Sequence, residues 1–250
     1  MPAPAIDPRY IFYLEPHVES PLGQQLRCYF QAARDHLGPT EAQQYPPHCS
    51  MVGFFTLDPS QEAEMAAIAS ARIAECLAAG GEKAVSVKLS AIRVNPPGSS
   101  SPTAPSLDAA IRTTPPPSSP SLRLQLDTTG IAQIATALRD SLKTLGAQLR
   151  PKPADHISLA YFSSYPLLHK SPHALHFARQ STPHRDDHTP PAKVSFNVQQ
   201  YYDLACSLIC KQSLQSPCPW SIVLYREHHS RILDRPHLFE EIQRWDLGLL

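Results

Sequence analysis

A short pattern, His-x-Ser followed by an apolar residue, occurs once in each half of this chain, at His48–Met51 (HCSM) and at His156–Leu159 (HISL). Each copy leads into an apolar run containing aromatic residues, VGFF at 52–55 and AYF at 160–162, and such runs are typical of strands. Successive side chains of a strand point to opposite faces. Each copy is therefore predicted to present an imidazole and a hydroxyl side by side.

The same order of elements precedes both copies. In the first half, a strand at 9–16 is followed by an amphipathic helix from Ser20-Pro21 to Gly38-Pro39, and then by the first copy. In the second half, a strand at 122–126 and a helix with apolar residues from Ile131 to Leu145 precede the second copy. We interpret this repetition as a diverged internal duplication, which predicts two similar halves facing one another.

Other segments complete an α+β prediction of antiparallel sheets with flanking helices. A helix is expected from the capping residue Asp58 to about Ala79, and an alternating strand at 85–91. Towards the C-terminus we expect a short strand at 194–198, a helix at 201–214 and a strand at 220–225. The tail to Leu250 is expected to form a closing helix whose packed residues are Leu238, Phe239, Ile242 and Trp245.

Two proline-rich stretches interrupt this pattern. Residues 95–120 carry eight prolines and six serines and offer almost nothing to bury, so we expect a flexible insertion. Residues 163–192 form a second insertion, rich in His and Pro. Its histidines are irregularly spaced and no cysteine accompanies them, which favours a solvated loop over a metal site. Residues 1–250 are therefore expected to form a single bilobal domain with two insertions and no metal.

Composition limits the partners and the compartment. The 22 basic residues are balanced by 22 acidic residues, so the chain lacks the charge excess with which proteins grip long nucleic acids. The charge balance still allows a small nucleotide or an RNA end as the substrate. The six cysteines form no C-x-x-C pair, and neither a signal peptide nor a membrane-spanning run is evident. We expect a cytoplasmic or nuclear monomer with reduced thiols and no membrane partner.

Two paired imidazoles and hydroxyls point to phosphate chemistry. Histidine transfers protons near neutral pH, and a pair of histidines can act as base and acid. Hydroxyl groups on the same face can donate hydrogen bonds to phosphate oxygens. On a 2′,3′-cyclic phosphate, one histidine would activate water while the other protonates the departing ribose oxygen. This scheme needs neither a metal nor another cofactor.

The two tetrapeptides resemble the signature of the two-histidine (2H) phosphoesterase superfamily, which carries two H-Φ-[S/T]-Φ motifs on facing strands of a bilobal, pseudo-twofold α+β fold. The order of the opening strand, the helix and the first motif is similar to the cyclic phosphodiesterase branch, over residues 9–94 and 121–162 and loosely over 193–230. The resemblance implies that His48 and His156 are catalytic and that Ser50 and Ser158 bind the phosphate. Cys49 stands where the family has an aliphatic residue.

Aromatic residues on the predicted strands are candidates for stacking on a nucleobase. Tyr161 and Tyr13 are the residues we select, although most aromatic residues on strands belong to the core. Tyr161 lies at an odd offset from His156, so regular alternation would place it on the opposite face. Its role at the site therefore requires a bend in the strand past Ala160.

The expected function is hydrolysis of 2′,3′-cyclic phosphates, either of cyclic nucleotides or of ADP-ribose cyclic phosphate. Two alternatives stay open: trimming of RNA 3′ ends, in which the 2′-hydroxyl attacks and a cyclic phosphate is the product, and a nucleotide-binding module without turnover. The intact His and Ser at all four motif positions favour an enzyme. Which histidine is the acid depends on the direction of reaction and is left undecided by the sequence.

Overall fold

The structure is a computed structural model that describes residues 8–38, 40–80, 86–95, 120–162, 197–209, 218–227 and 239–249. It confirms a mixed α+β fold with two antiparallel sheets and several helices. Apart from Asn95 and Pro120, the two insertions predicted at 95–120 and 163–192 lie outside the described residues. Within the described part of the chain, no helix has the length and apolar character needed to cross a bilayer.

The larger sheet holds the first His-x-Ser copy. Its strand order is β2-β1-β7-β8, with β3 also paired to β1. The smaller sheet has the order β4-β5-β6 and holds the second copy on β6. All pairs are antiparallel. The strands are β1 (Arg9–Pro16), β2 (Cys49–Ser50), β3 (Phe55–Thr56), β4 (Ser86–Asn95), β5 (Ser121–Thr129), β6 (His156–Tyr161), β7 (Pro219–Glu227) and β8 (Phe239–Leu249).

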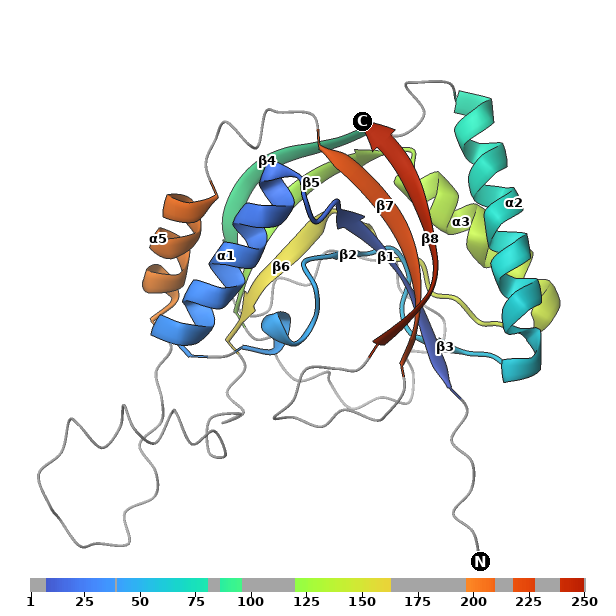
Figure 1. Ribbon diagram of the computed structural model, residues 1–250, viewed down its shortest axis with the longest axis horizontal. Helices are drawn as coiled ribbons and strands as arrows, with labels where there is room; N and C mark the ends of the chain where they lie inside the picture. Colours follow the sequence, from blue (N-terminus) through green and yellow to red (C-terminus); the bar gives the residue numbers. More distant parts are fainter. Residues whose placement is uncertain are drawn as a thin grey trace, which may run out of the picture.

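The helices pack in two pairs (Figure 1). α1 and α5 lie side by side at the left of the view, and α2 and α3 lie side by side at the right. The Ser20 hydroxyl caps α1 by accepting from the Gly23 amide, and the Asn197 side chain caps α5. The helices are α1 (Pro21–His36), α2 (Glu62–Gly80), α3 (Ile131–Leu142) and α5 (Val198–Leu208), with short 3-10 turns η1 (Glu41–Gln44), η2 (Pro59–Gln61) and η5 (Lys143–Leu145).

One hydrophobic cluster contains residues of both sheets and of the four α-helices in the described part of the chain. β1 shows how the first sheet serves this core. Tyr10, Phe12 and Leu14 point into the cluster, whereas Ile11 and Tyr13 point to the other face and form a smaller cluster with β7 residues. Since alternate residues of a strand face opposite ways, the second face of β1 is left to carry the candidate site.

The predicted repetition of strand, helix and motif strand appears in both halves. β1, α1 and β2 form the first unit, and β5, α3 and β6 form the second. In each unit the motif strand pairs antiparallel with the strand that precedes the helix. The halves also exchange strands, because β4 joins the second unit while β7 and β8 join β1. The two motifs therefore occupy corresponding places in their sheets.

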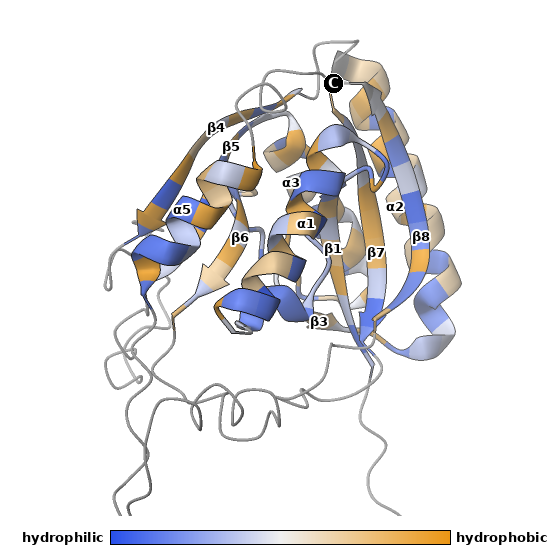
Figure 2. Cartoon of the chain, turned by 60° about the vertical axis from the view of Figure 1, so that its left-hand side comes forward, coloured by the Kyte–Doolittle hydropathy of each residue, from blue (hydrophilic) through white to orange (hydrophobic). Residues whose placement is uncertain are grey.

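The closing helix predicted for the C-terminal tail is wrong. Phe239–Leu249 form the long strand β8, which pairs with β7, and hydrophilic and hydrophobic residues alternate along it in Figure 2. Ile242 has no partner on β7, because Leu224 pairs with Gln243 and Tyr225 with Glu241. This bulge shifts the alternation by one residue. Ile242 and Trp245, three residues apart, therefore both pack against the principal cluster, whereas Phe239 packs in the smaller one; a spacing of three is also what a helix would show.

Further boundaries differ from the prediction. The strand expected at 194–198 is wrong for its last two residues, because Asn197 is the N-cap of α5 and Val198 is the first residue of that helix. Residues 194–196 lie outside the described part of the chain. The strand expected to continue from the first motif to Phe55 is interrupted, since only β2 and β3 pair with β1. Between them, Val52 bridges to Pro151 instead. The helix predicted at 201–214 is α5, which begins at Val198 and ends at Leu208 with Ile209 as its C-cap; residues 210–214 lie outside the described part. The remaining predicted helices and strands are present within the described residues.

Candidate active site

The first motif lies at the edge of the larger sheet. β2 pairs with β1 so that Ser50 is opposite Tyr13 and Cys49 is opposite Leu14. Directly opposed residues of an antiparallel pair share a face, so Ser50 lies on the Tyr13 face, while Cys49 enters the core with 1% of its surface exposed. The ring of His48, immediately before β2, stacks on Tyr13 with ring centroids 3.7 Å apart.

A backbone carbonyl holds the His48 ring. Nδ1 lies 2.7 Å from the Pro46 carbonyl oxygen, and because a carbonyl only accepts, Nδ1 donates its proton there. The pKa of His48 is lowered to about 4, chiefly by burial; the charges of Lys152 and His156 contribute to this lowering, and the hydrogen bond to Pro46 opposes it. At neutral pH His48 is therefore uncharged, with Nε2 left as a proton acceptor.

A carboxylate holds the second imidazole. On β6, Ile157 and Leu159 are buried in the core, and His156 faces the other way. Its Nδ1 lies 2.7 Å from the Asp155 Oδ1. Burial lowers the pKa of His156, the Asp155 hydrogen bond opposes this shift, and the charges of Arg123 and Lys152 add to it. A carboxylate stabilises an imidazolium more strongly than a carbonyl does, so the two rings have different environments.

A β-bulge brings Tyr161 to the face of the second motif. Ser158 and Ala160 each pair with a residue of β5, but Leu159 between them has no partner there. The extra residue shifts the alternation, so Tyr161 returns to the side of Ser158. The Tyr161 hydroxyl lies 2.6 Å from the Ser158 Oγ. The irregularity lies at Leu159, one residue before the position at which a bend was expected.

The two motifs meet where the sheets adjoin. Backbone hydrogen bonds of 2.8 and 2.9 Å join segment 51–53 to segment 150–152, just after the first motif and just before the second. The thiol of Cys49 is hydrogen-bonded to the backbone of His156, and this bond lowers the thiol pKa against the larger, raising effect of burial. The motif strands β2 and β6 are in contact, and the charge of His156 also acts on the pKa of His48, so the two motifs lie beside one another at this junction.

The predicted aromatic candidates have different surroundings. Tyr13 is 1% exposed and lies against the His48 ring, so its contact is with an imidazole of the site. Burial raises the pKa of Tyr13, and the charges of neighbouring groups, Tyr161 among them, raise it further. Tyr161 itself is only half-buried. Tyr161 is therefore the more accessible of the two rings, and Tyr13 supports His48.

Several residues around the motifs escaped the sequence analysis. Tyr45 meets the His48 ring edge-on at 5.6 Å, Asp155 anchors His156, and the charge of Lys152 acts on both histidines. Asp155 and Lys152 lie just before the second motif, which is the one sequence signal that could have indicated them. Arg123 does not belong to this missed group, because its place on the strand predicted at 122–126 already made it a candidate for favouring an anionic substrate; it lies opposite Ser158 and is a second cation beside His156.

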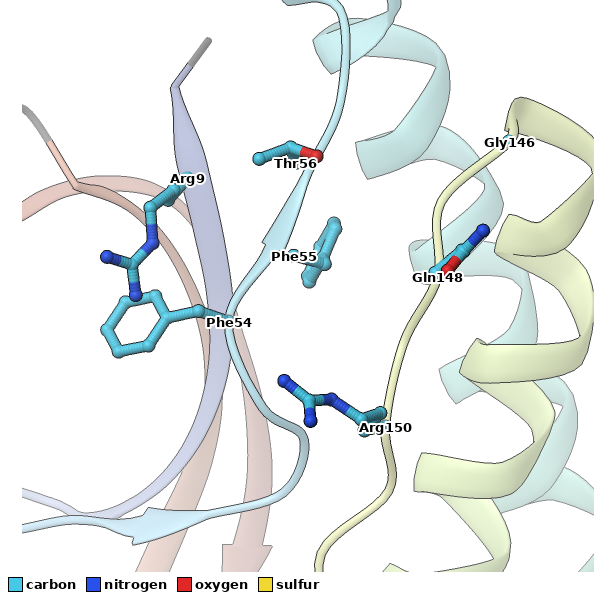
Figure 3. A pocket seen from close by; sticks show the side chains of 7 residues that line it. All are labelled: Arg9, Phe54, Phe55, Thr56, Gly146, Gln148 and Arg150. Carbon is cyan, nitrogen blue, oxygen red and sulfur yellow. The ribbon is translucent and has the colours of Figure 1, made fainter. Parts of the chain in front are cut away.

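Two adjoining cavities extend from this junction. One has a volume of about 760 Å³ and the other about 520 Å³, and both are lined by Arg9, Phe54 and Arg150. Lys152 lines the smaller cavity. Figure 3 shows Arg150 reaching from the segment after α3 toward Phe54, against which Arg9 lies. Neither His48 nor His156 is among the lining residues; the cavities are bordered by segment 53–56, which follows the first motif, and by residues of segment 146–152, which precedes the second.

Among the described residues, no group of three or more His, Cys, Asp or Glu side chains is arranged to hold a metal ion. The histidines of the 163–192 insertion lie outside the described part.

No protein-family model matches the chain, and no curated protein or solved structure is significantly similar to it. The functional inference therefore depends on the residues of this chain and on their geometry.

Proposed function

We propose that this protein is a phosphodiesterase that hydrolyses 2′,3′-cyclic phosphates, with the two-histidine phosphoesterase fold that its motifs resemble. The observation that carries the proposal is the neighbouring pair of imidazoles, each anchored through Nδ1 and each accompanied by a serine. His48 donates to the Pro46 carbonyl and His156 to the Asp155 carboxylate. In both rings Nε2 is left for substrate, as acid–base catalysis requires.

The anchoring partners support a division of labour between the histidines. His48 is neutral at pH 7 and can accept a proton from the attacking water as its oxygen bonds to phosphorus. His156, whose imidazolium is stabilised by Asp155, can donate a proton to the ribose oxygen as the P–O bond breaks. The product is a phosphate monoester. Since base and acid are both side chains, the reaction needs no metal.

Hydroxyl groups accompany both imidazoles and can hold the phosphate. Ser50 lies on the face of Tyr13 in the larger sheet, and Ser158 lies next to the Tyr161 hydroxyl in the smaller one. Donors aimed at the non-bridging oxygens stabilise the charge that develops on the phosphorane-like transition state. Arg123 and Lys152, whose charges reach His156, favour binding of an anion in the same place.

The same residues would serve trimming of an RNA 3′ end, in which a ribose 2′-hydroxyl replaces water as the nucleophile. The cationic cavities beside the imidazoles favour this second candidate, because a polynucleotide would continue into them. The balance of 22 basic and 22 acidic residues argues against a long RNA. A binding module without turnover would use the cavities and leave both imidazoles idle.

The test is turnover of cyclic nucleotides, ADP-ribose cyclic phosphate and short RNAs in the presence of EDTA. The parent protein is expected to open cyclic phosphates, and His48→Ala and His156→Ala should each reduce kcat by about 100-fold or more, since each removes a general acid or base. His36→Ala is the matched control, because this histidine is exposed at the end of α1 and should retain parent activity.

Three results would identify a different function. Shortening of RNA without hydrolysis of small cyclic phosphates would establish the trimming reaction. Nucleotide binding that survives both substitutions, with no turnover by the folded parent, would establish a binding module. Activity that EDTA abolishes would contradict the two-histidine mechanism.

A further inference from the structure

The two cavities beside the imidazoles continue the proposed reaction centre. Segments 51–53 and 150–152, which border the smaller cavity, are joined by backbone hydrogen bonds. Lys152 lines this cavity, and its charge reaches both His48 and His156. A substrate whose cyclic phosphate lies between the imidazoles would therefore place its next group beside Lys152.

The lining is strongly cationic. Arg9, Arg150 and Lys152 come from two separate parts of the chain and meet here, and no carboxylate is among the described residues that line either cavity. The whole chain has equal numbers of basic and acidic residues, so this accumulation of positive charge is local. An anionic ligand is what such a lining would select.

Arg9 is held in place by contacts on two sides. Its guanidinium lies 4.2 Å from the centroid of the Phe54 ring, a cation–π geometry, and its Nε lies 3.3 Å from the nearly buried carboxylate of Glu227. Glu227 offsets part of the charge and fixes the side chain. Arg150 is exposed and forms no ion pair within the described residues. The planar guanidinium group of Arg150 presents N–H donors that match the oxygens of a phosphate.

We infer that this cationic cavity, lined by Arg9, Phe54, Arg150 and Lys152, binds a second phosphate group of the substrate. The inference rests on the proposed function and specifies its substrate class: a cyclic phosphate that carries another phosphate on the same or an adjoining sugar. The volumes of about 760 and 520 Å³ lie within the range of small-ligand sites. Gln148 and Thr56, also on the lining, add neutral hydrogen-bonding groups.

The experiment compares kcat/KM for adenosine 2′,3′-cyclic phosphate with kcat/KM for the same compound bearing a 5′-phosphate. The parent protein should prefer the 5′-phosphorylated compound by about tenfold, the size expected for a charge-assisted hydrogen bond. Arg150→Gln should bring the ratio close to one. Arg72→Gln, an exposed arginine on α2, is the matched control and should keep the ratio of the parent.

A binding measurement separates this inference from the proposed reaction. Titration calorimetry with adenosine 2′-phosphate and adenosine 2′,5′-bisphosphate should show about tenfold tighter binding of the bisphosphate to the parent, lost in Arg150→Gln. Without turnover, this binding pattern would sustain the second-phosphate site and overturn the proposed reaction alone. Turnover with equal kcat/KM for both compounds, or a preference that survives in Arg150→Gln, would overturn the second-phosphate site.

Discussion

The Nδ1 atoms of the two motif histidines have different hydrogen-bond partners, and in the proposed reaction this difference favours different roles for the two rings. His48 donates to a neutral carbonyl, whereas His156 donates to the Asp155 carboxylate. Two histidines in the same His-x-Ser pattern thus have different environments, because different groups accept the hydrogen bond from Nδ1. In the proposed reaction, His48 accepts a proton from the attacking water and His156 donates a proton to the departing ribose oxygen.

The pH dependence of kcat/KM follows from these environments. As general base, His48 must be neutral, so activity should rise with pH through its pKa of about 4. As general acid, His156 must be protonated, so activity should fall as pH rises through its pKa, which burial lowers from 6.5 against the opposing hydrogen bond of Asp155. The expected profile is a bell with its maximum on the acidic side of pH 6.5.

Asp155→Asn should displace one limb of this bell. Without the carboxylate, the imidazolium of His156 is less stable and its pKa falls. If His156 is the acid, the descending limb moves to lower pH while the ascending limb stays. A shift of the ascending limb instead would show that His156 is the base and would reverse the assignment. Circular dichroism at each pH ensures that the fold is retained.

Tyr161→Phe isolates the contribution of one hydroxyl. The Tyr161 hydroxyl contacts the Ser158 Oγ at 2.6 Å, and its loss should lower kcat by about tenfold, since one donor to the developing charge is removed or misplaced.

Comparison with Tyr161→Ala tests the stacking role. If the ring also stacks on a nucleobase, the alanine variant will raise KM as well, while Tyr161→Phe will not. Equal kinetic constants for all three proteins would exclude Tyr161 from the site.

At the scale of elements, bulges decide which side chains reach the site and the core. The unpaired Leu159 turns Tyr161 toward Ser158, and the unpaired Ile242 lets β8 present an apolar spacing that resembles a helix. In both strands one additional residue reverses the alternation of all residues beyond it. Periodicity alone does not reveal where such a residue lies.

Trp245→Ala tests the packing of β8 against the core and α2. The Trp245 ring stacks on Phe12 of β1 with centroids 6.2 Å apart, and its indole N–H donates to the Ser70 Oγ of α2 at 2.9 Å. Its removal should lower the free energy of unfolding by about 3 kcal/mol, as expected for a large aromatic side chain in contact with the core.

Urea denaturation measures this change. Val94→Ala, an exposed residue of β4 with 41% of its surface accessible, serves as the matched control and should change stability by less than about 0.5 kcal/mol. An effect of Trp245→Ala no larger than that of the control would contradict the packing of β8 against α2.

At the scale of the whole molecule, one core serves both sheets. The principal hydrophobic cluster contains Phe12 and Leu224 of the larger sheet and Leu124 and Ile157 of the smaller sheet. If one sheet separates from this cluster, the apolar residues that the other sheet contributes also become exposed. The site at their junction is therefore as stable as the molecule itself.

Equilibrium unfolding should accordingly be a single cooperative transition. The fluorescence of Trp220 and Trp245 reports the larger sheet, because both lie on its strands, whereas far-ultraviolet circular dichroism reports helices and both sheets. The two transitions in urea should coincide. Fluorescence that changes at a distinctly different urea concentration from the dichroism would show that the sheets unfold separately.

The sequence by itself determined the recurrence of His-x-Ser after strand and helix, because local patterns specify helices, strands and the face on which alternate residues lie. It also placed Cys49 and Ile157 in the core opposite the imidazoles. Only the tertiary structure decided that Asp155, Lys152 and Arg150 surround the motifs, and that β4, β7 and β8 exchange between the halves. These arrangements depend on contacts between distant segments and on single unpaired residues. Neither can be recognised from the periodicity of apolar residues in the sequence.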